Sequence, residues 1–253
     1  MVPVSVVAAW AGAARSRFGV SFVDASGVGR EEPLAGCWNT AFEQVLPVRR
    51  FPSFKGQRNF PGWWWSCKTG RHVGHESWLE RDHAMLLDFD EQVVAFSSQP
   101  FRLSWPDEAG WRSHVPDFFA RLADGSGMVL DIRADDRIEP SDAEAFAATR
   151  DACTEVGWSF RRVGVVDPVF LGNVRWLSRY RHPRCGRRHE VADHLVEAFA
   201  EPAPLLEGAG RVGDPLGVLP VLYHLIWRGV LRADLDSAVL SSSSVVVARD
   251  GER

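Results

Sequence analysis

Residues 114–133, HVPDFFARLADGSGMVLDIR, place two short apolar segments on either side of a turn at residues 123–127. This pattern predicts two adjacent antiparallel strands. Each segment carries one aspartate, Asp117 or Asp131, and Arg133 follows the second aspartate by two positions. A carboxylate in a buried strand is costly unless it is paired or binds a metal ion. The stretch therefore raises the question of what these carboxylates hold.

A metal-dependent hydrolytic site is one answer. Residues at matching register on antiparallel strands lie only a few ångströms apart, so the two aspartates would repel each other without a cation between them. Carboxylate oxygens select Mg²⁺ or Mn²⁺. Asp131 and Arg133 are two residues apart and share one face of the strand. Such a set suits phosphodiester hydrolysis, in which a metal lowers the pKa of bound water and a cation stabilises developing charge.

A purely structural interpretation of the same residues stays open. Asp131 and Arg133 could form an ion pair on the strand surface, and Asp117 could be a turn residue after Pro116. A Pro-Asp pair with a downstream Asp-x-Arg is a weak pattern by itself.

A predicted helix precedes the two strands, in HESWLERDHAMLLDFD at residues 75–90. Its apolar positions follow a helical stripe. Glu76, Glu80 and His83 lie close together on it, because positions three and four apart are neighbours. Glu80 could therefore supply a third carboxylate.

The remaining elements are predicted from periodicity and turn residues. A hairpin is expected around Asp24–Gly27, strands at 93–96, 99–105 and 158–166, and helices at 168–180 and within 218–231. A helix at 141–156 has Ser141 as its predicted N-cap, with Glu144 completing a capping box. Residues 201–217 are rich in proline and glycine and predict a linker or loop. Two short strands around a serine-rich turn are expected in 231–249.

Charge is unevenly distributed in this chain of 253 residues, whose net charge is −4 and whose composition, 45% hydrophobic and 25% charged, is that of an ordinary soluble protein. No acidic residue occurs in 44–75 or in 175–189, although each stretch holds six arginines and lysines. The stretches are either solvated faces or a track for DNA phosphates. The candidate DNA-binding residues are Lys55, Arg58, Arg179, Arg181, Arg184 and Arg187.

The four cysteines are far apart and form no CxxC pair, which favours a reducing cytoplasm without a disulfide framework. The N-terminus lacks the basic region of a signal peptide, and no segment is long enough to cross a membrane. Zinc binding by two Cys/His groups is conceivable, but neither has the spacing of a standard finger. These groups are Cys67, His72 and His75, and His182, Cys185 and His189.

The order of these elements resembles the PD-(D/E)xK nuclease core of restriction-endonuclease-like proteins. Residues 75–101, with Gln99-Pro100-Phe101 at their end, then 114–133 and 173–184 are together similar to the TnsA family, the endonuclease subunits of heteromeric transposases, and most closely to its actinobacterial type. The resemblance implies a mixed α/β sheet flanked by helices, with a C-terminal winged-helix-like module. The expected regions are a β-rich N-terminal part (1–70) packing on the core, a nuclease core (71–189) and the module (190–253).

The resemblance also implies a reaction and its partners. TnsA-like subunits cut the 5′ ends of the transposon in double-stranded DNA, and a TnsB-like DDE transposase cuts and joins the 3′ ends, with an ATPase regulator as a further partner. Glu80, Asp117 and Asp131 map onto the acidic, metal-binding triad for Mg²⁺ or Mn²⁺. Arg133 maps onto the catalytic lysine, and this departure leaves open a rival hypothesis, a DNA-binding adaptor subunit whose nuclease site has decayed.

Overall fold

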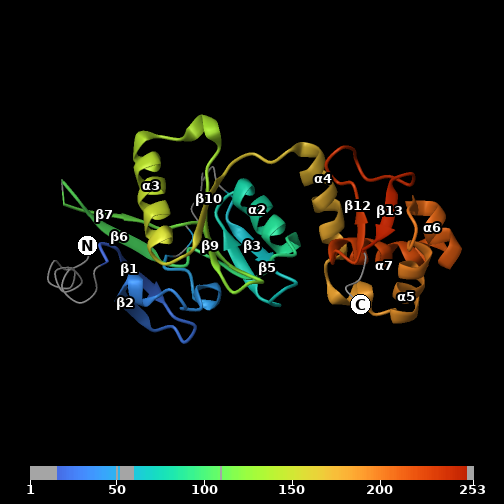
Figure 1. Cartoon of the computed structure of the whole chain (residues 1–253), viewed down its shortest axis with the longest axis horizontal. Helices are drawn as coiled ribbons and strands as arrows, with labels where there is room; N and C mark the ends of the chain where they lie inside the picture. The colour runs from blue at the N-terminus through green and yellow to red at the C-terminus, as the bar shows by residue number, and fades with distance from the viewer. Residues whose placement is uncertain (1–15, 50, 52–59, 109, 250–253) are drawn as a thin grey trace. The chain divides into compact units, whose positions relative to one another are not determined.

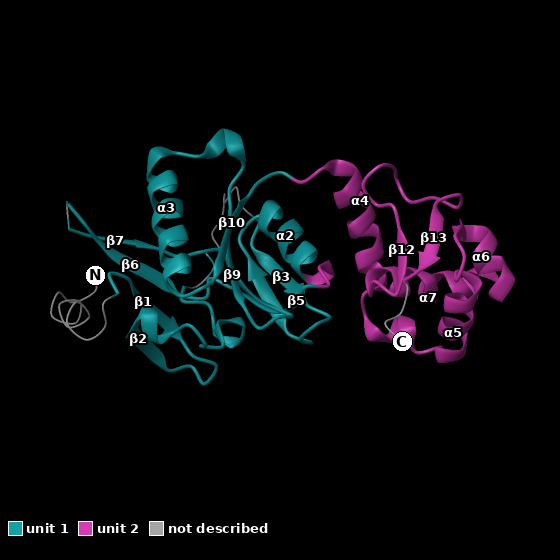
Figure 2. Cartoon of the chain, viewed as in Figure 1, with its two compact units in different colours: residues 1–87, 92–165 teal, residues 88–91, 166–253 magenta. Residues whose placement is uncertain are grey.

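The computed structural model describes residues 16–49, 51, 60–108 and 110–249 (Figure 1). Packing divides the chain into two compact units, residues 1–87 with 92–165 and residues 88–91 with 166–253 (Figure 2). The division into 1–70, 71–189 and 190–253 stays a prediction, whereas packing separates the chain after Val165. Within the described ranges, no helix combines the length and apolar character that a membrane crossing requires.

The first unit contains an antiparallel sheet with the order β2-β1-β6-β7. Its strands are β1 (Gly19–Val23), β2 (Gly29–Pro33), β6 (Arg102–Asp107) and β7 (Gly110–His114). The predicted hairpin is confirmed as β1–β2. Asp24 Oδ1 accepts hydrogen bonds from the backbone N–H groups of Ser26 and Val28, both at 3.0 Å, and Gly27 has a φ of 86°. The aspartate and the glycine thus supply the bonds and the backbone conformation that this turn needs.

A second, mixed sheet with the order β10-β9-β8-β5 lies at the centre of the first unit. Its strands are β5 (Val93–Ser98), β8 (Phe118–Leu122), β9 (Gly127–Ile132) and β10 (Ser159–Val163). β9 and β10 are parallel, and α3 (Pro140–Glu155) makes the long crossover that a parallel pair requires. This α/β architecture is consistent with a restriction-endonuclease-like fold, as the sequence predicts.

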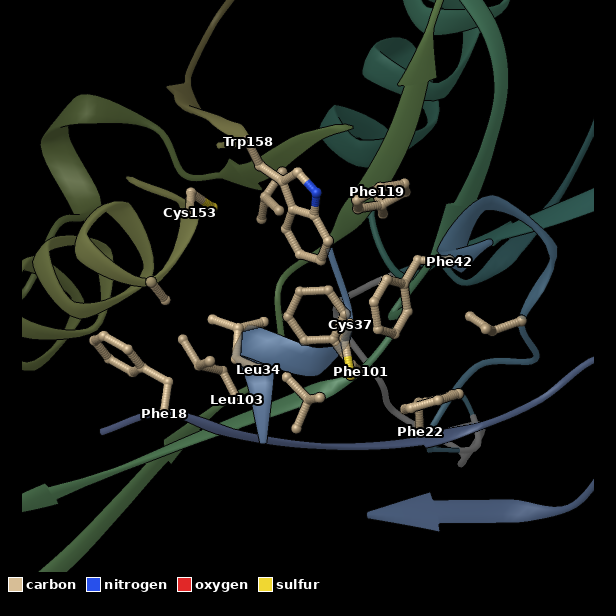
Figure 3. Packing of buried hydrophobic residues seen from close by; sticks show 14 residues of the cluster. Phe18, Phe22, Leu34, Cys37, Phe42, Phe101, Leu103, Phe119, Cys153 and Trp158 are labelled. Carbon is tan, nitrogen blue, oxygen red and sulfur yellow. The ribbon is translucent and has the colours of Figure 1, made fainter. Parts of the chain in front are cut away.

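Side chains that alternate along the central strands pack on opposite faces of this sheet. Phe118 and Met128 belong to a cluster with Ala84 and Leu87 of α2 (Trp78–Phe89). Phe119 belongs to the other cluster, which joins α3 and the β1–β6 strands and is shown in Figure 3. The buried faces fix the register of the strands, because a slip of one residue would exchange the two apolar sets.

Phe42 lies at the centre of this second cluster and is fully buried. Its ring makes edge contacts with Phe22, Phe101 and Trp158 at centroid separations of 5.0, 4.9 and 5.5 Å. The residue comes from a 3₁₀ turn, η2 (Phe42–Gln44), between distant strands. Its contacts hold together elements that are far apart in the sequence.

The predicted cap of α3 is wrong by two residues. Glu139 is the N-cap, Pro140 opens the helix, and the backbone N–H of Glu139 donates to Asp142 Oδ2 at 3.1 Å. Proline suits the first helical position, because its fixed φ is helical and the missing N–H would have no partner there. The capping pair is therefore Glu139 and Asp142 rather than Ser141 and Glu144.

The second unit is helical with one small antiparallel sheet of order β11-β13-β12. Its helices are α4 (Pro168–Leu177), α5 (His189–Ala198), α6 (Leu205–Val212) and α7 (Pro215–Trp227), and its strands are β11 (Ala203–Pro204), β12 (Leu231–Ala233) and β13 (Val245–Ala248). The helix predicted at 168–180 is confirmed as α4 and a following 3₁₀ turn, η4 (Ser178–Tyr180). The strands expected in 231–249 are also found.

The linker predicted at 201–217 is wrong, because these residues form β11, α6 and the start of α7. Leu205 and Ala209 are buried in the core of the unit. A Cβ at Gly208 would lie 2.3 Å from ring atoms of Phe199, so this glycine allows close helix packing rather than a flexible loop. Helix α5, which the sequence patterns did not predict, contacts both α6 and α7.

Candidate active site

The two aspartates of the opening stretch lie opposite each other. In the β8–β9 ladder Phe118 faces Leu130, and one further step along this register brings Asp117 opposite Asp131. Asp117 Oδ2 accepts a hydrogen bond from the backbone N–H of Ile132 at 2.6 Å. The predicted juxtaposition of the two carboxylates is therefore present at the ends of these strands.

Several carboxylates act on Asp117. Burial is the largest cause that raises the pKa of Asp117 well above its ordinary value of 3.8, and the carboxylates of Asp131, Glu80 and Glu76 raise it further. The hydrogen bond from Ile132 opposes the rise without cancelling it. Like charges gathered in this way disfavour ionisation unless a cation joins them.

Asp131 is almost completely buried, with 1% of its surface exposed. His114 Nε2 lies 2.9 Å from its Oδ1 atom and donates to it when the carboxylate is ionised. Its Oδ2 atom is buried and has no hydrogen-bond partner among the described residues. A buried oxygen without a hydrogen bond costs free energy, so a ligand that bound this atom would stabilise the site.

Gln99 supports the other aspartate through its backbone. Its N–H donates to the carbonyl oxygen of Asp117 at 2.8 Å, and its carbonyl oxygen accepts from Val48 at 3.0 Å. Gln99 has a φ of 47°, a left-handed conformation that is uncommon outside glycine. This strained backbone, in the Gln-Pro-Phe segment, ties the Pro-Asp loop to β5.

Glu80 lies in the first turn of α2, where it caps its own helix. Its Oε2 atom accepts from the backbone N–H of Glu76 at 2.6 Å, and its Oε1 atom accepts from the Ser77 hydroxyl at 2.9 Å. Burial raises the pKa of Glu80 above its ordinary value of 4.5, and these hydrogen bonds lower it in part. The predicted ligand is thus near Asp117 but engaged in local bonds.

Glu76 is a second glutamate at this position, and one of its oxygens is without a partner. Its Oε2 atom accepts from Arg49 Nη2 at 2.8 Å, whereas its buried Oε1 atom has no hydrogen-bond partner within the described part of the chain. His83 does not join the carboxylates, since its Nε2 atom contacts the carbonyl oxygen of Gly164 at 2.8 Å. Glu76 is therefore an alternative third ligand.

Arg133 follows β9 and is anchored at both its backbone and its side chain. The backbone N–H donates to Val163 at 2.9 Å, which extends the parallel pairing by one residue. The guanidinium donates to Asp142 Oδ1 at 2.8 Å in the first turn of α3, and 46% of the side chain is exposed. The hydrogen bond with Asp142 raises the pKa of Arg133, and the charge of Asp117 contributes to the rise. The cation is thus near the aspartates but paired elsewhere.

A divalent cation fits the donor chemistry of this site. The carboxylates are hard oxygen ligands, they repel one another, and the Oδ2 atom of Asp131 lacks a partner. In their present positions, no three His, Cys, Asp or Glu side chains of the described residues form a group that could hold a metal ion. Asp117 and Asp131 would thus be the first ligands, and a glutamate would complete the set by moving.

The predicted DNA-binding residues have different surroundings. Lys55 and Arg58 lie outside the described residues. Arg179, Arg184 and Arg187 are exposed in the second unit, where the Arg179 guanidinium lies 5.0 Å from the centre of the Trp176 ring. Arg181 is half-buried and donates to the carbonyl oxygen of Ser178 at 2.7 Å. Arg181 is therefore the least suited of the described four to hold a DNA phosphate.

The conceivable zinc groups gain no support. None of the four cysteines, Cys37, Cys67, Cys153 and Cys185, forms a disulfide. No Cys/His cluster of metal-binding size is present in residues 60–108 or 110–249. Zinc binding therefore does not enter the proposals below.

Glu80→Gln is expected to lower DNA cleavage less than Asp117→Ala does. Glu80 uses both oxygens to cap α2 and would reach a metal through water. The variant should also lose about 0.5–1 kcal/mol of stability, since one of its two capping oxygens becomes an amide nitrogen. Nicking rates and thermal melts of both variants test this. Glu76→Gln is the matched control, and cleavage lost there but retained in Glu80→Gln would make Glu76 the third ligand.

Asp117→Asn is expected to stabilise the protein by about 1 kcal/mol, or 2–4 °C in Tm, at pH values well above the ordinary aspartate pKa of 3.8. The raised pKa of Asp117 means that wild-type stability is full below the ordinary value of 3.8 and falls as pH rises through the native value. The asparagine can still accept from Ile132. Melting curves from pH 4 to 8 should separate progressively.

The control for this experiment is Asp124→Asn in the β8–β9 turn. Hydrogen bonds from Ser126 lower the pKa of Asp124, which is the opposite sign. No stabilisation with rising pH is expected there. Equal melting curves for Asp117→Asn and wild type at every pH would contradict the carboxylate repulsion.

Part of the chain matches a family of known proteins. Residues 90–163 match the family model described as "TnsA-like endonuclease N terminal". This segment includes Asp117, Asp131 and Arg133 but begins after Glu80. A search of curated proteins returned no match to the chain.

Proposed function

We propose that this chain is the endonuclease subunit of a heteromeric transposase, because residues 90–163 match the family model of the TnsA-like endonuclease N terminal region. In this proposal it hydrolyses the phosphodiester at the 5′ ends of a transposon, and a TnsB-like DDE transposase processes the 3′ ends. We also propose that an ATPase regulator is a further partner. The chain would belong to the actinobacterial type of the family. The chain and its partner proteins would act together on double-stranded DNA in the cytoplasm.

The observation that carries the proposal is the pair of opposed aspartates inside the matched segment. Asp131 is buried with one orphaned oxygen, and Asp117 is surrounded by other carboxylates. A strand-surface ion pair, the structural alternative, does not describe this arrangement, because Arg133 pairs with Asp142 and not with Asp131. Asp131 is buried and Asp117 is half-buried, and no arginine or lysine of the described residues pairs with either, which supports a metal-dependent reaction.

Asp117, Asp131 and Glu80 would hold Mg²⁺ or Mn²⁺. When bound, the metal polarises the phosphate and lowers the pKa of a water molecule. His114 orients Asp131 through its 2.9 Å contact and leaves Oδ2 for the ligand. Arg133 would turn from Asp142 toward the phosphate and stabilise the charge that develops on it.

The second unit supports a winged-helix-like module. Its order α5-β11-α6-α7-β12-β13, with β13 between β11 and β12, is the helix and strand order that such a module uses. α7 holds the place of a recognition helix. From Pro215 to Trp227 it contains no arginine or lysine. We therefore assign sequence recognition at the transposon ends to the partner transposase.

Reconstitution with the partner tests this function. The full chain, a TnsB-like transposase and a DNA carrying transposon ends are incubated with Mg²⁺, Mn²⁺ or EDTA, and strand ends are mapped by sequencing. Metal-dependent breaks at the 5′ ends are expected only when this chain is present. Processing of the 3′ ends with intact 5′ strands in both metals would contradict the proposal.

The adaptor hypothesis is favoured by one observation, the engagement of Arg133 with Asp142. Under that hypothesis the arginine is a structural replacement for a catalytic lysine, and the chain binds DNA and partner without cutting. The reconstitution separates the two functions, since an adaptor would raise 3′ processing and leave 5′ strands whole.

A further inference from the structure

Three large aromatic side chains are exposed beside the candidate active site. Phe60, Trp63 and Trp78 expose 56%, 61% and 51% of their surfaces. Trp78 is the first residue of α2, two positions before Glu80. We call these three residues the aromatic surface. Contiguous exposed apolar groups mark an interaction site more often than singly exposed ones do.

The β3–β4 hairpin brings the aromatic surface to the start of α2. β3 (Gly62–Trp65) pairs with β4 (His72–His75), and Gly62 faces His75 in the register. The rings of Phe60 and Trp78 are stacked at a tilt of 32° with a centroid separation of 5.6 Å.

A glycine on β4 makes room for an aromatic ring that contacts Trp63. Trp63 faces Gly74 across the hairpin, so no side chain lies opposite it on β4. A Cβ at Gly74 would lie 2.1 Å from the Phe51 ring, and Phe51 makes an edge contact with Trp63 at 5.4 Å. The Trp63 ring is thus in contact with Phe51, while 61% of the residue stays exposed.

Cations lie in the same segment as these aromatic residues. The described residues of 44–75 include Arg49, Lys68 and Arg71 and no acidic residue. At Trp78, the guanidinium of Arg81 lies 4.3 Å from the ring centre and also pairs with Asp82 at 2.6 Å. Aromatic faces beside cations are the combination by which proteins bind single-stranded nucleic acid.

The carboxylates of the candidate active site are close to Trp78 in the sequence. Glu76 and Glu80 flank Trp78 in the sequence, and both carboxylates raise the pKa of Asp117. A strand whose phosphate reached the aspartates would therefore pass close to the aromatic surface. Bases inside a duplex are already stacked, so these side chains can engage only bases that have left the helix.

We propose that the aromatic surface binds unpaired bases of the DNA strand next to the cleavage position. Trp78, extended by Phe60, forms one stacking platform, and Trp63 forms a second. This inference rests on the proposed function only in placing the bound bases next to a cleavage position. It adds a preference for melted or frayed DNA at the transposon end.

Binding measured in EDTA tests the inference separately from cleavage. Fluorescence anisotropy compares full-length wild type with Trp78→Ala and Trp63→Ala on a single-stranded oligonucleotide and on its duplex. Each variant should weaken single-strand binding roughly five- to a hundredfold, the range for loss of one stacked base, and duplex binding much less. Trp78→Phe should retain most of the affinity. 2-Aminopurine in the oligonucleotide should be quenched by wild type and less by Trp78→Ala.

Trp38→Ala is the matched control, because Trp38 is also 61% exposed but lies outside this surface. It should bind single strands as wild type does. Equal binding by Trp78→Ala, Trp63→Ala and wild type, or equal binding of an abasic strand, would overturn the inference. So would variants that bind single strands normally and lose only the transposase. In each case metal-dependent nicking by wild type would leave the proposed function standing, whereas its absence would sink that function alone.

Discussion

Asp131→Ala is expected to abolish metal-dependent cleavage, with a loss of at least about 10³-fold in nicking rate. The substitution removes a carboxylate that is 1% exposed. It also removes the Oδ2 atom, which has no hydrogen-bond partner among the described residues and is the proposed metal ligand. Asp117→Ala should have the same effect, because Asp117 is the opposing ligand. The measurement is nicking of a labelled transposon end in Mg²⁺ and in Mn²⁺.

The fold should survive both substitutions. Each one relieves carboxylate repulsion, and the apolar clusters on the two faces of the sheet are untouched. Far-UV circular dichroism and melting curves check this, and Asp124→Ala in the exposed β8–β9 turn is the control for loss of an aspartate from the same hairpin. Cleavage at the wild-type rate by Asp131→Ala would show that the metal is held elsewhere.

The placement of Asp117 opposite Asp131 could be predicted because it depends on a two-residue period. The alternation in residues 114–133 determines which side chains are buried together, and the turn at 123–127 sets the register. These two features place Asp117 opposite Asp131. The fold class follows from the same local patterns, since the order of helices and strands leaves few ways to cover both faces of the central sheet.

The contacts that complete the site could not be predicted in this way. His114 is in the opening stretch, but its contact with Asp131 depends on where β7 ends relative to β9, which no local period encodes. Glu76 and Glu80 are both near Asp117, and only the structure shows which of them caps the helix. The linker or loop predicted at 201–217 is wrong in part because the packing of Gly208 against Phe199 is a tertiary contact, which no local pattern encodes.

Arg133→Ala is expected to reduce cleavage by about 2–4 kcal/mol in activation free energy, or roughly 30- to 1,000-fold. Arg133 occupies the position two residues after Asp131 where the resemblance expects the catalytic lysine. The charge of Asp117 contributes to the raised pKa of Arg133. An arginine stays protonated, its pKa being above about 12, so it cannot serve as a general base. Its contribution must come from a fixed positive charge and from binding two phosphate oxygens at once.

Arg133→Lys therefore distinguishes the two alternative functions, an active endonuclease and a decayed adaptor. If only a positive charge is needed, lysine should cleave within roughly tenfold of wild type, about 1.4 kcal/mol. Asp142→Ala is the control for the ion pair, because it removes the partner that holds Arg133 at 2.8 Å and leaves the cation in place. Equal stability losses in Arg133→Ala and Asp142→Ala, with cleavage unchanged in both, would make the arginine structural. An inert wild type that gains cleavage on Arg133→Lys would instead establish the decayed adaptor, because lysine can lose a proton beside a metal and arginine cannot.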